Sequence, residues 1–147
     1  MRHAQQTLVH LVLAIVLAVF YLYAIQAFFR FHPIEMDLWF GFFEVTANNA
    51  LVMASLNHWS ALLIAAFPIA ILLHYFVPRF AYRLALATAL IVTAHVNYDF
   101  WNSYKQFNSQ FALRDQLIFL SDCIKFLITI PIVLWIVRNL LPKKAEY

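Results

Sequence analysis

Glycine, cysteine and charge are all scarce in this chain of 147 residues, and each shortage limits what the protein can be. One glycine excludes a glycine-rich loop for phosphate, and one cysteine, Cys123, excludes an internal disulfide or a paired-thiol redox site. Charged residues make up 12% of the sequence, whereas soluble domains carry about 25%. With 65% hydrophobic residues, the chain is predicted to be an integral membrane protein in a lipid bilayer.

Apolar runs cover residues 7–29, 60–77, 81–101 and 116–138, close to the length of about 20 residues that crosses a bilayer. Between the first two runs, an aromatic stretch is interrupted by proline, charged residues and asparagines. Residues 36–57 are therefore predicted to form an interfacial or re-entrant helix. The expected fold is one all-α membrane domain over residues 1–147, a bundle of four transmembrane helices with this additional helix.

The scarcity of glycine also affects how such helices can pack. Without glycine, close approach of two helices has to rely on alanine. Ala81, Ala85 and Ala89 recur every four residues in the third run and are predicted to lie at a helix contact. Pro68 and Pro131 interrupt the second and fourth runs and predict kinks there.

Basic residues are spread unevenly over the two sides of the predicted bundle. Six of them fall on the side of the termini and three on the other side, which by the positive-inside rule places both termini in the cytoplasm of a bacterial inner membrane. The net charge of +3 is scattered over helix ends, so a nucleic-acid partner is not expected. The six are Arg2, Arg79, Arg83, Arg138, Lys143 and Lys144, and the three are Arg30, Lys105 and Arg114.

Ionisable side chains lie within or beside the third and fourth apolar runs, where inserting each charge costs roughly 2.5 to 3.5 kcal/mol. His95, Asp99 and Asn102 are four and three residues apart and share one helix face. Asp122 and Lys125 lie one turn apart on the next helix. In antiparallel neighbours, His95 and Asp122 are expected to meet roughly 9 Å below the outer surface, with Lys125 balancing the carboxylate.

These five residues allow two interpretations. Polar pairs can fasten helices together, contributing about 0.6 kcal/mol each. Alternatively, the five line an outward-facing pocket that binds a ligand or exchanges protons, as ionisable groups within membranes commonly do. Metal binding by His95 and Asp99 lacks an evident third ligand, so no metal is expected.

Two further histidines lie near the opposite ends of their runs. His10 lies about four residues into the first run and His74 about four residues from the end of the second, so both are placed at similar depth near the cytoplasmic face. A pair of this kind is what a bis-histidine haem b in a helical bundle needs. The alternative is that each ring extends separately toward the interface.

The second half of the chain resembles the DoxX family of small four-helix membrane proteins. Near its end the third run has His95 and, four residues later, "DFW", and the fourth opens "QLIFLSDCIKFL". These segments are similar to the His-x-Phe-Trp and Phe-Leu-x-Asn motifs of that family. The first motif would fall on His95, Phe100 and Trp101, and the second on Phe119, Leu120 and Asp122. The resemblance implies an accessory subunit of a respiratory or redox complex, or one that contacts a quinone.

Taken together, these features favour a membrane subunit over a stand-alone enzyme. The first hypothesis is an accessory subunit whose outward-side polar pocket meets a larger complex or a quinone-like ligand. If the pocket holds a quinone headgroup, His95 and Asp122 are its expected hydrogen-bond partners. The second hypothesis is a non-catalytic interaction protein, such as an assembly factor or an immunity-type protein. A small transporter is less favoured, because the sequence contains no inverted repeat.

Overall fold

Four helices make up the part of the chain that the structure describes. The computed structural model describes the backbone of residues 2–31, 50–107 and 113–141. The helices are α1 (Arg2–Phe31), α3 (Ala50–Phe76), α4 (Ala81–Phe107) and α5 (Leu113–Leu140). Every regular element in these ranges is helical, as predicted. Residues 36–49, most of the predicted interfacial segment, lie outside the described residues.

Three of the four helices are long and apolar enough to cross a membrane. The segments that meet this condition are Gln5–Phe28 in α1, Ser55–Phe76 in α3 and Leu120–Leu140 in α5. They fall on three of the four predicted spans and agree with a bilayer environment. The fourth helix, α4, has 27 residues but includes Arg83, Asp99 and Lys105.

Helix α3 begins earlier than the sequence suggested. Residues 50–57, which were assigned to the separate interfacial segment, continue without a break into the apolar run. The polar residues near the expected boundary are accommodated within the helix: Asn57 is buried, and the Ser60 hydroxyl donates to the carbonyl of Leu56 at 2.9 Å. Polar residues are compatible with the interior of a helix when neighbouring helices cover them or when they bond the helix backbone. Polarity alone therefore did not mark the start of α3.

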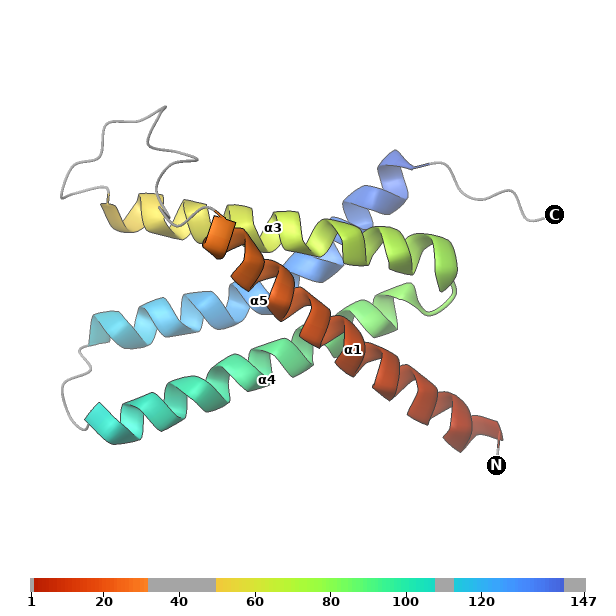
Figure 1. The fold of residues 1–147 in the computed structure, drawn as a ribbon, viewed down its shortest axis with the longest axis horizontal. Coiled ribbons are helices and arrows are strands. Elements are labelled where there is room, and N and C mark those ends of the chain that lie inside the picture. The colour runs from red at the N-terminus through yellow and green to blue at the C-terminus, as the bar shows by residue number, and fades with distance from the viewer. Residues whose placement is uncertain (1, 32–49, 108–112, 142–147) are drawn as a thin grey trace.

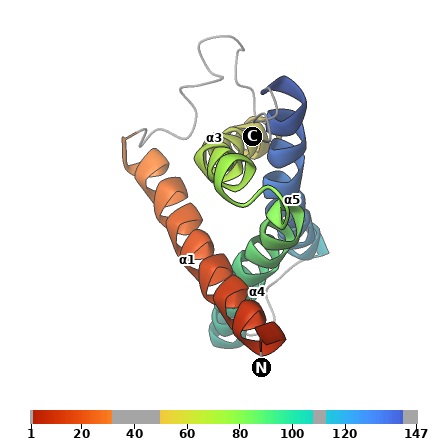
Figure 2. The same ribbon diagram turned by 90° about the vertical axis from the view of Figure 1, so that its right-hand side faces the viewer.

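Helix α5 packs against both α3 and α4, whereas α3 and α4 make few contacts with each other. Helix α5 lies on the side of the bundle opposite to α1 (Figures 1 and 2). Helix α1 crosses the group diagonally, packing on both α4 and α3 (Figure 1). Since α3 and α4 are joined by a short turn, α4 runs antiparallel to α3 and α5.

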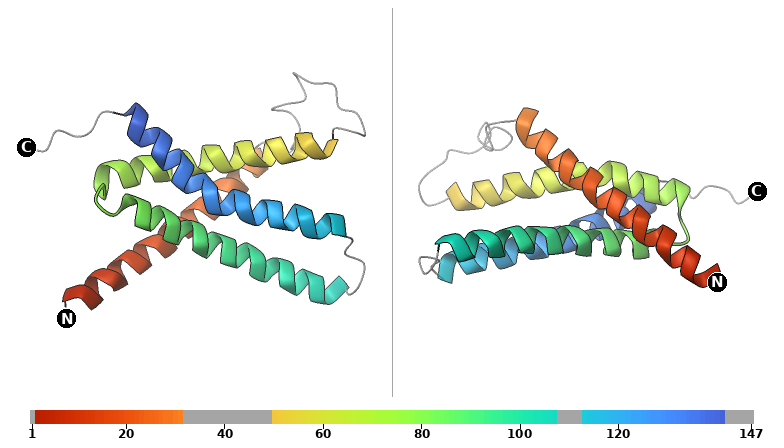
Figure 3. Two further views of the ribbon diagram at one scale, coloured as in Figure 1. Left: turned by 180° about the vertical axis from the view of Figure 1, so that it is seen from behind. Right: turned by 60° about the horizontal axis from the view of Figure 1, so that its bottom comes forward.

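The bundle therefore has two distinct ends. The "turn end" contains residues 77–80, where Phe80 N–H donates to the Val77 carbonyl at 3.1 Å, and Pro78 belongs to this turn. The "connection end" contains the start of α3, the end of α4 and the start of α5. Helix α5 changes direction between its first and second halves (Figure 3), and it contains Pro131, which lacks the N–H needed for the helical ladder.

Alanine dominates the helix contacts. Ala81, Ala85 and Ala89 are all buried on α4, which confirms the prediction that alanine replaces glycine at a close helix contact. The buried alanines of the other helices are Ala14 and Ala18 on α1 and Ala61, Ala65, Ala66 and Ala70 on α3. Larger apolar side chains fill the space between them, including Leu62, Ile69, Val92 and Leu134.

Candidate functional site

Lys125 and Asp122 form the ion pair that their spacing predicted. Lys125 Nζ lies 2.9 Å from Asp122 Oδ1, one turn away on α5. Lys125 is only 5% exposed. An ammonium group that is removed from water needs a counter-charge, and the Asp122 carboxylate supplies it.

The third member of this cluster is His58 on α3, which the sequence analysis did not select. His58 Nδ1 lies 3.4 Å from the same oxygen, Asp122 Oδ1, and the ring packs edge-on against Phe126 at 5.7 Å between centroids. We call His58, Asp122 and Lys125 the α3–α5 triad. The His58 and Asp122 side chains are 25% and 29% exposed, so the triad extends from a buried cation to a partly accessible edge.

The predicted hydrogen bond between His95 and Asp122 is wrong. His95 Nε2 lies 3.5 Å from Asp99 Oδ2, one turn along its own helix, and Asp122 pairs instead with His58 and Lys125. The His95 and Asp99 side chains are 53% and 62% exposed. Asn102, the third predicted residue on α4, is partly buried. The five residues expected to share one pocket are thus divided between the inside and the outside of the bundle.

The diagonal course of α1 accounts for this division. At Thr88, α1 covers α4 closely: Thr88 is fully buried, and its hydroxyl donates to the carbonyl of Ala14 at 3.5 Å. Farther along α4, α1 has moved across to α3 (Figure 1). The helix face that is covered at Thr88 is therefore uncovered two turns later at His95, although the two residues share that face in sequence.

Asn97 provides the direct polar link between α4 and α5 that His95 was expected to make. Its amide Nδ2 donates to Cys123 Sγ at 3.3 Å and to the Thr93 carbonyl at 2.8 Å. This contact puts Asn97 at the level of Cys123. Because the helices are antiparallel, His95 lies near the level of Lys125 and Asp99 near that of Ser121.

Buried hydroxyl groups continue from the triad toward the centre of the bundle. Thr129 on α5 donates to the backbone carbonyl of Lys125. The hydroxyl of Tyr21 on α1 donates to the carbonyl of Leu62 on α3 at 3.2 Å. Tyr21 and Thr129 are fully buried. The Tyr21 bond joins α1 to α3 and is one structural use of the polar groups that the sequence analysis considered.

The two histidines suggested as haem ligands have different surroundings. The His10 ring lies 4.6 Å from the ring of Phe80, at the start of α4. His74 is buried on α3, 4.8 Å from the ring of its neighbour Tyr75, and neither ring nitrogen has a hydrogen-bond partner within the described residues. In that part of the chain, no ring contact joins His10 to His74, and ligation of haem b stays a prediction.

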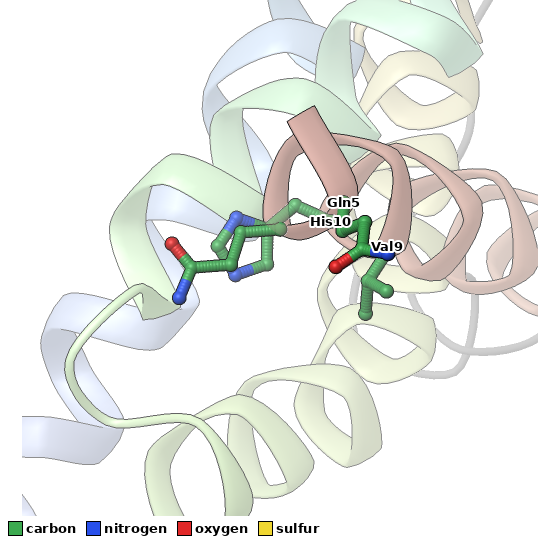
Figure 4. A pocket seen from close by; sticks show the side chains of 4 residues that line it. Gln5, Val9 and His10 are labelled. Atoms are coloured by element: carbon green, nitrogen blue, oxygen red, sulfur yellow. The ribbon is translucent and has the colours of Figure 1, made fainter. Parts of the chain in front are cut away.

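His10 also lines a hollow on the outside of the bundle. The hollow has a volume of about 290 Å³ and is lined by Gln5, Gln6, Val9 and His10 (Figure 4). All four residues belong to the first turns of α1, at the turn end. Across the described ranges, three or more histidine, cysteine or acidic side chains do not gather in a way that could hold a metal ion.

Comparisons with protein-family models, curated proteins and solved structures gave no match. The similarity to the DoxX family therefore rests on the two short motifs alone and stays a prediction. Of the motif residues, Asp122 belongs to the triad and His95 lies on the outside of α4.

Proposed function

We propose that this protein is an accessory membrane subunit with four spans that joins a partner membrane protein through the outer half of α4. The residues that make this contact are the exposed His95, Tyr98 and Asp99, which we call the outer α4 face. The proposal keeps a non-catalytic role for the chain. A docking surface takes the place of the single polar pocket that the sequence suggested.

The course of α4 supports a fourth span. With 27 residues, α4 is about 40 Å long, enough to cross the hydrocarbon core of about 30 Å. It packs against α1 and α5, both of which can cross the membrane by length and composition. Four spans place the two ends of the chain on one side. Arg79, Arg83 and Arg138 at the turn end favour the cytoplasm for that side.

The observation that carries the proposal is an exposed contact between His95 and Asp99 at the outer end of the apolar region, with His95 the deeper of the two. The apolar segment of α5 begins at Leu120, and His95 lies near the level of Lys125, five residues farther in. At 1.5 Å per residue this depth is roughly 7.5 Å. Ionisable groups at such a depth usually face a protein interior or a water-filled cavity. A partner protein on the outer α4 face would provide that environment.

Native mass spectrometry in mild detergent tests this association. We expect the wild-type chain to be extracted with a second, different polypeptide, and the double variant His95→Leu, Asp99→Leu to lose it, since both leucines are compatible with lipid. Gln26→Leu, a change of an exposed polar residue on α1, serves as the matched control and should retain the partner. Unchanged partner retention in the double variant would contradict the proposal.

A second candidate function is the binding of a lipid-soluble ligand with a polar head, such as a quinone, at the α3–α5 triad. It is favoured by one observation: His58 and Asp122 are about a quarter exposed, while the adjoining Lys125 is buried. In this role the His58 ring, carrying a proton on both nitrogens, would donate a hydrogen bond from Nε2 to a ligand carbonyl. Asp122 would hold the ring in place, and Lys125 would keep the carboxylate charged.

The two candidates predict opposite results for two histidine variants. For ligand binding at the triad, His58→Leu should release a bound molecule of a few hundred daltons, while His95→Leu should retain it. The measurement is the mass of material that remains bound to the protein extracted with mild detergent. If both variants carry the same bound mass as the wild type, the triad is only a structural ion pair.

A further inference from the structure

The hollow beside His10 has the composition of a site for a lipid headgroup. Its lining includes two amide side chains, Gln5 and Gln6, and the imidazole of His10, all able to donate hydrogen bonds. Figure 4 shows Gln5, Val9 and His10 around it. A volume of about 290 Å³ is near the lower limit of small-molecule sites, which suits a headgroup rather than a whole lipid.

An aromatic contact brings positive charge close to this hollow. Phe80 lies 4.6 Å from the His10 ring, and the Arg79 guanidinium carbon lies 5.7 Å from the centre of the same Phe80 ring. The Arg79 guanidinium therefore lies over the same Phe80 ring that His10 contacts. Arg83, also exposed, follows one turn along α4.

The electrostatic balance at this end of the bundle is one-sided. The charged side chains that the structure describes at the turn end are Arg79, Arg83 and Arg138, all positive. The carboxylates with described side chains, Asp99 and Asp122, belong to the connection end. An anion at the turn end would therefore meet several cations and no described carboxylate.

The hollow also lies at the correct depth for a headgroup. The apolar segment of α1 begins at Gln5, and that of α3 ends at Phe76, just before the turn. Gln5 is thus at the boundary between the hydrocarbon core and the headgroup layer, and His10 lies five residues farther in, roughly 7.5 Å, from where its ring can extend toward that boundary. Beyond Val9, the exposed residues Leu11 and Val12 continue along α1 as an apolar surface for acyl chains.

We propose that this hollow binds the phosphate headgroup of an anionic phospholipid in the leaflet next to the α3–α4 turn. Gln5, Gln6 and His10 donate hydrogen bonds to the phosphate and glycerol oxygens. Arg79 and Arg83 supply the charge that favours an anionic over a zwitterionic lipid, as basic groups near a membrane surface do. This site is independent of the outer α4 face and of the triad, which lie at the connection end.

The test is native mass spectrometry of the full chain with equal amounts of phosphatidylglycerol and phosphatidylcholine. We expect preferential retention of phosphatidylglycerol, reduced about fivefold by Arg79→Gln. Arg138→Gln is the matched control, because it removes the same charge at the same end, but Arg138 lies over the ring of Tyr82 at 5.1 Å, whereas Arg79 lies over the Phe80 ring that His10 contacts. His10→Leu should also reduce retention, because it removes one of the hydrogen-bond donors that line the hollow.

Three results would overturn the proposal. Equal retention of the two lipids would show that anionic headgroups are not selected. Equal losses in Arg79→Gln and Arg138→Gln would indicate a diffuse positive field instead of a site. Displacement of the lipid by millimolar inorganic phosphate would show that the hollow binds free anions. Thermal unfolding of each variant, which we expect to match the wild type because these side chains are exposed or at the surface, separates loss of binding from loss of fold.

Discussion

At the scale of single residues, the buried ammonium group of Lys125 needs a counter-charge close by. Asp122 is within 2.9 Å, and His58 approaches the same carboxylate oxygen from the neighbouring helix. Breaking a buried ion pair by removing one partner is costly, because the remaining charge stays buried without compensation. The triad therefore allows two predictions that separate its members from His95.

Asp122→Asn should lower the free energy of unfolding by about 3 to 5 kcal/mol, since the Lys125 charge would lose its counter-ion. The double variant Asp122→Asn, Lys125→Met should recover most of that loss, because no charge then remains at the site. Equilibrium unfolding in mixed micelles measures both values. If the single variant is as stable as the double, the ammonium group does not depend on Asp122.

A double-mutant cycle between His58→Leu and Asp122→Asn should give a coupling free energy of about 0.6 kcal/mol, the average for polar pairs between membrane helices. The same cycle with His95→Leu should give a coupling near zero, because His95 pairs with Asp99 on the outside of α4. Unfolding titrations of the single and double variants provide the measurement. Reversed couplings would restore the pairing that the sequence suggested.

How much of the site was predictable depends on how local each contact is. The Asp122 and Lys125 pair follows from a spacing of three residues on one helix, and the structure confirms it. His58 was not selected because the sequence analysis assigned residues 36–57 to an interfacial segment and began the second span at residue 60. Its one available signal was the polar group Asn57, His58 and Ser60 next to a long apolar run.

At the scale of helices, small residues determine where close packing occurs. The burial of Ala81, Ala85 and Ala89 was predictable, because it needs only a spacing of four and the lack of glycine. The start of α3 was not, because a buried polar turn and an interfacial segment look alike in sequence. Whether a neighbouring helix covers the polar residues decides between them, and here Asn57 is buried.

Two alanines on α4 provide a matched test of this packing. Ala89 is fully buried, whereas Ala94, little more than one turn away, is exposed. Ala89→Leu should lower the free energy of unfolding by about 1 to 3 kcal/mol through overpacking. Ala94→Leu should leave the stability of the isolated protein nearly unchanged. Equal effects of the two variants in detergent-based unfolding would contradict the arrangement of α4.

At the scale of the whole molecule, the diagonal crossing of α1 decides which polar residues face outward. The sequence places Thr88, His95 and Asp99 on one face of α4, and the helix geometry agrees. The crossing angle of α1 is a property of the packed bundle and is not contained in the periodicity of α4. For this reason, one half of a continuous helix face is buried and the other is exposed.

The proposed fourth span makes a prediction about membrane topology. Arg79 and Asn102 lie near opposite ends of α4, about 35 Å apart along the helix. In a Cys123→Ser background, a cysteine at position 102 should react with a membrane-impermeant maleimide in intact cells, whereas one at position 79 should react only after lysis. Labelling of both from the same side would show that α4 does not cross the membrane.

The central claim is that another membrane protein covers the outer α4 face, and photo-crosslinking in intact membranes tests it most directly. A photoreactive amino acid would replace Tyr98 on α4 or, as the control, Tyr23 on α1, which are 65% and 68% exposed. We predict a specific crosslink to a second, different polypeptide from position 98 and crosslinks to lipid alone from position 23. Crosslinks to lipid alone from position 98, or only to another copy of this chain, would contradict the claim.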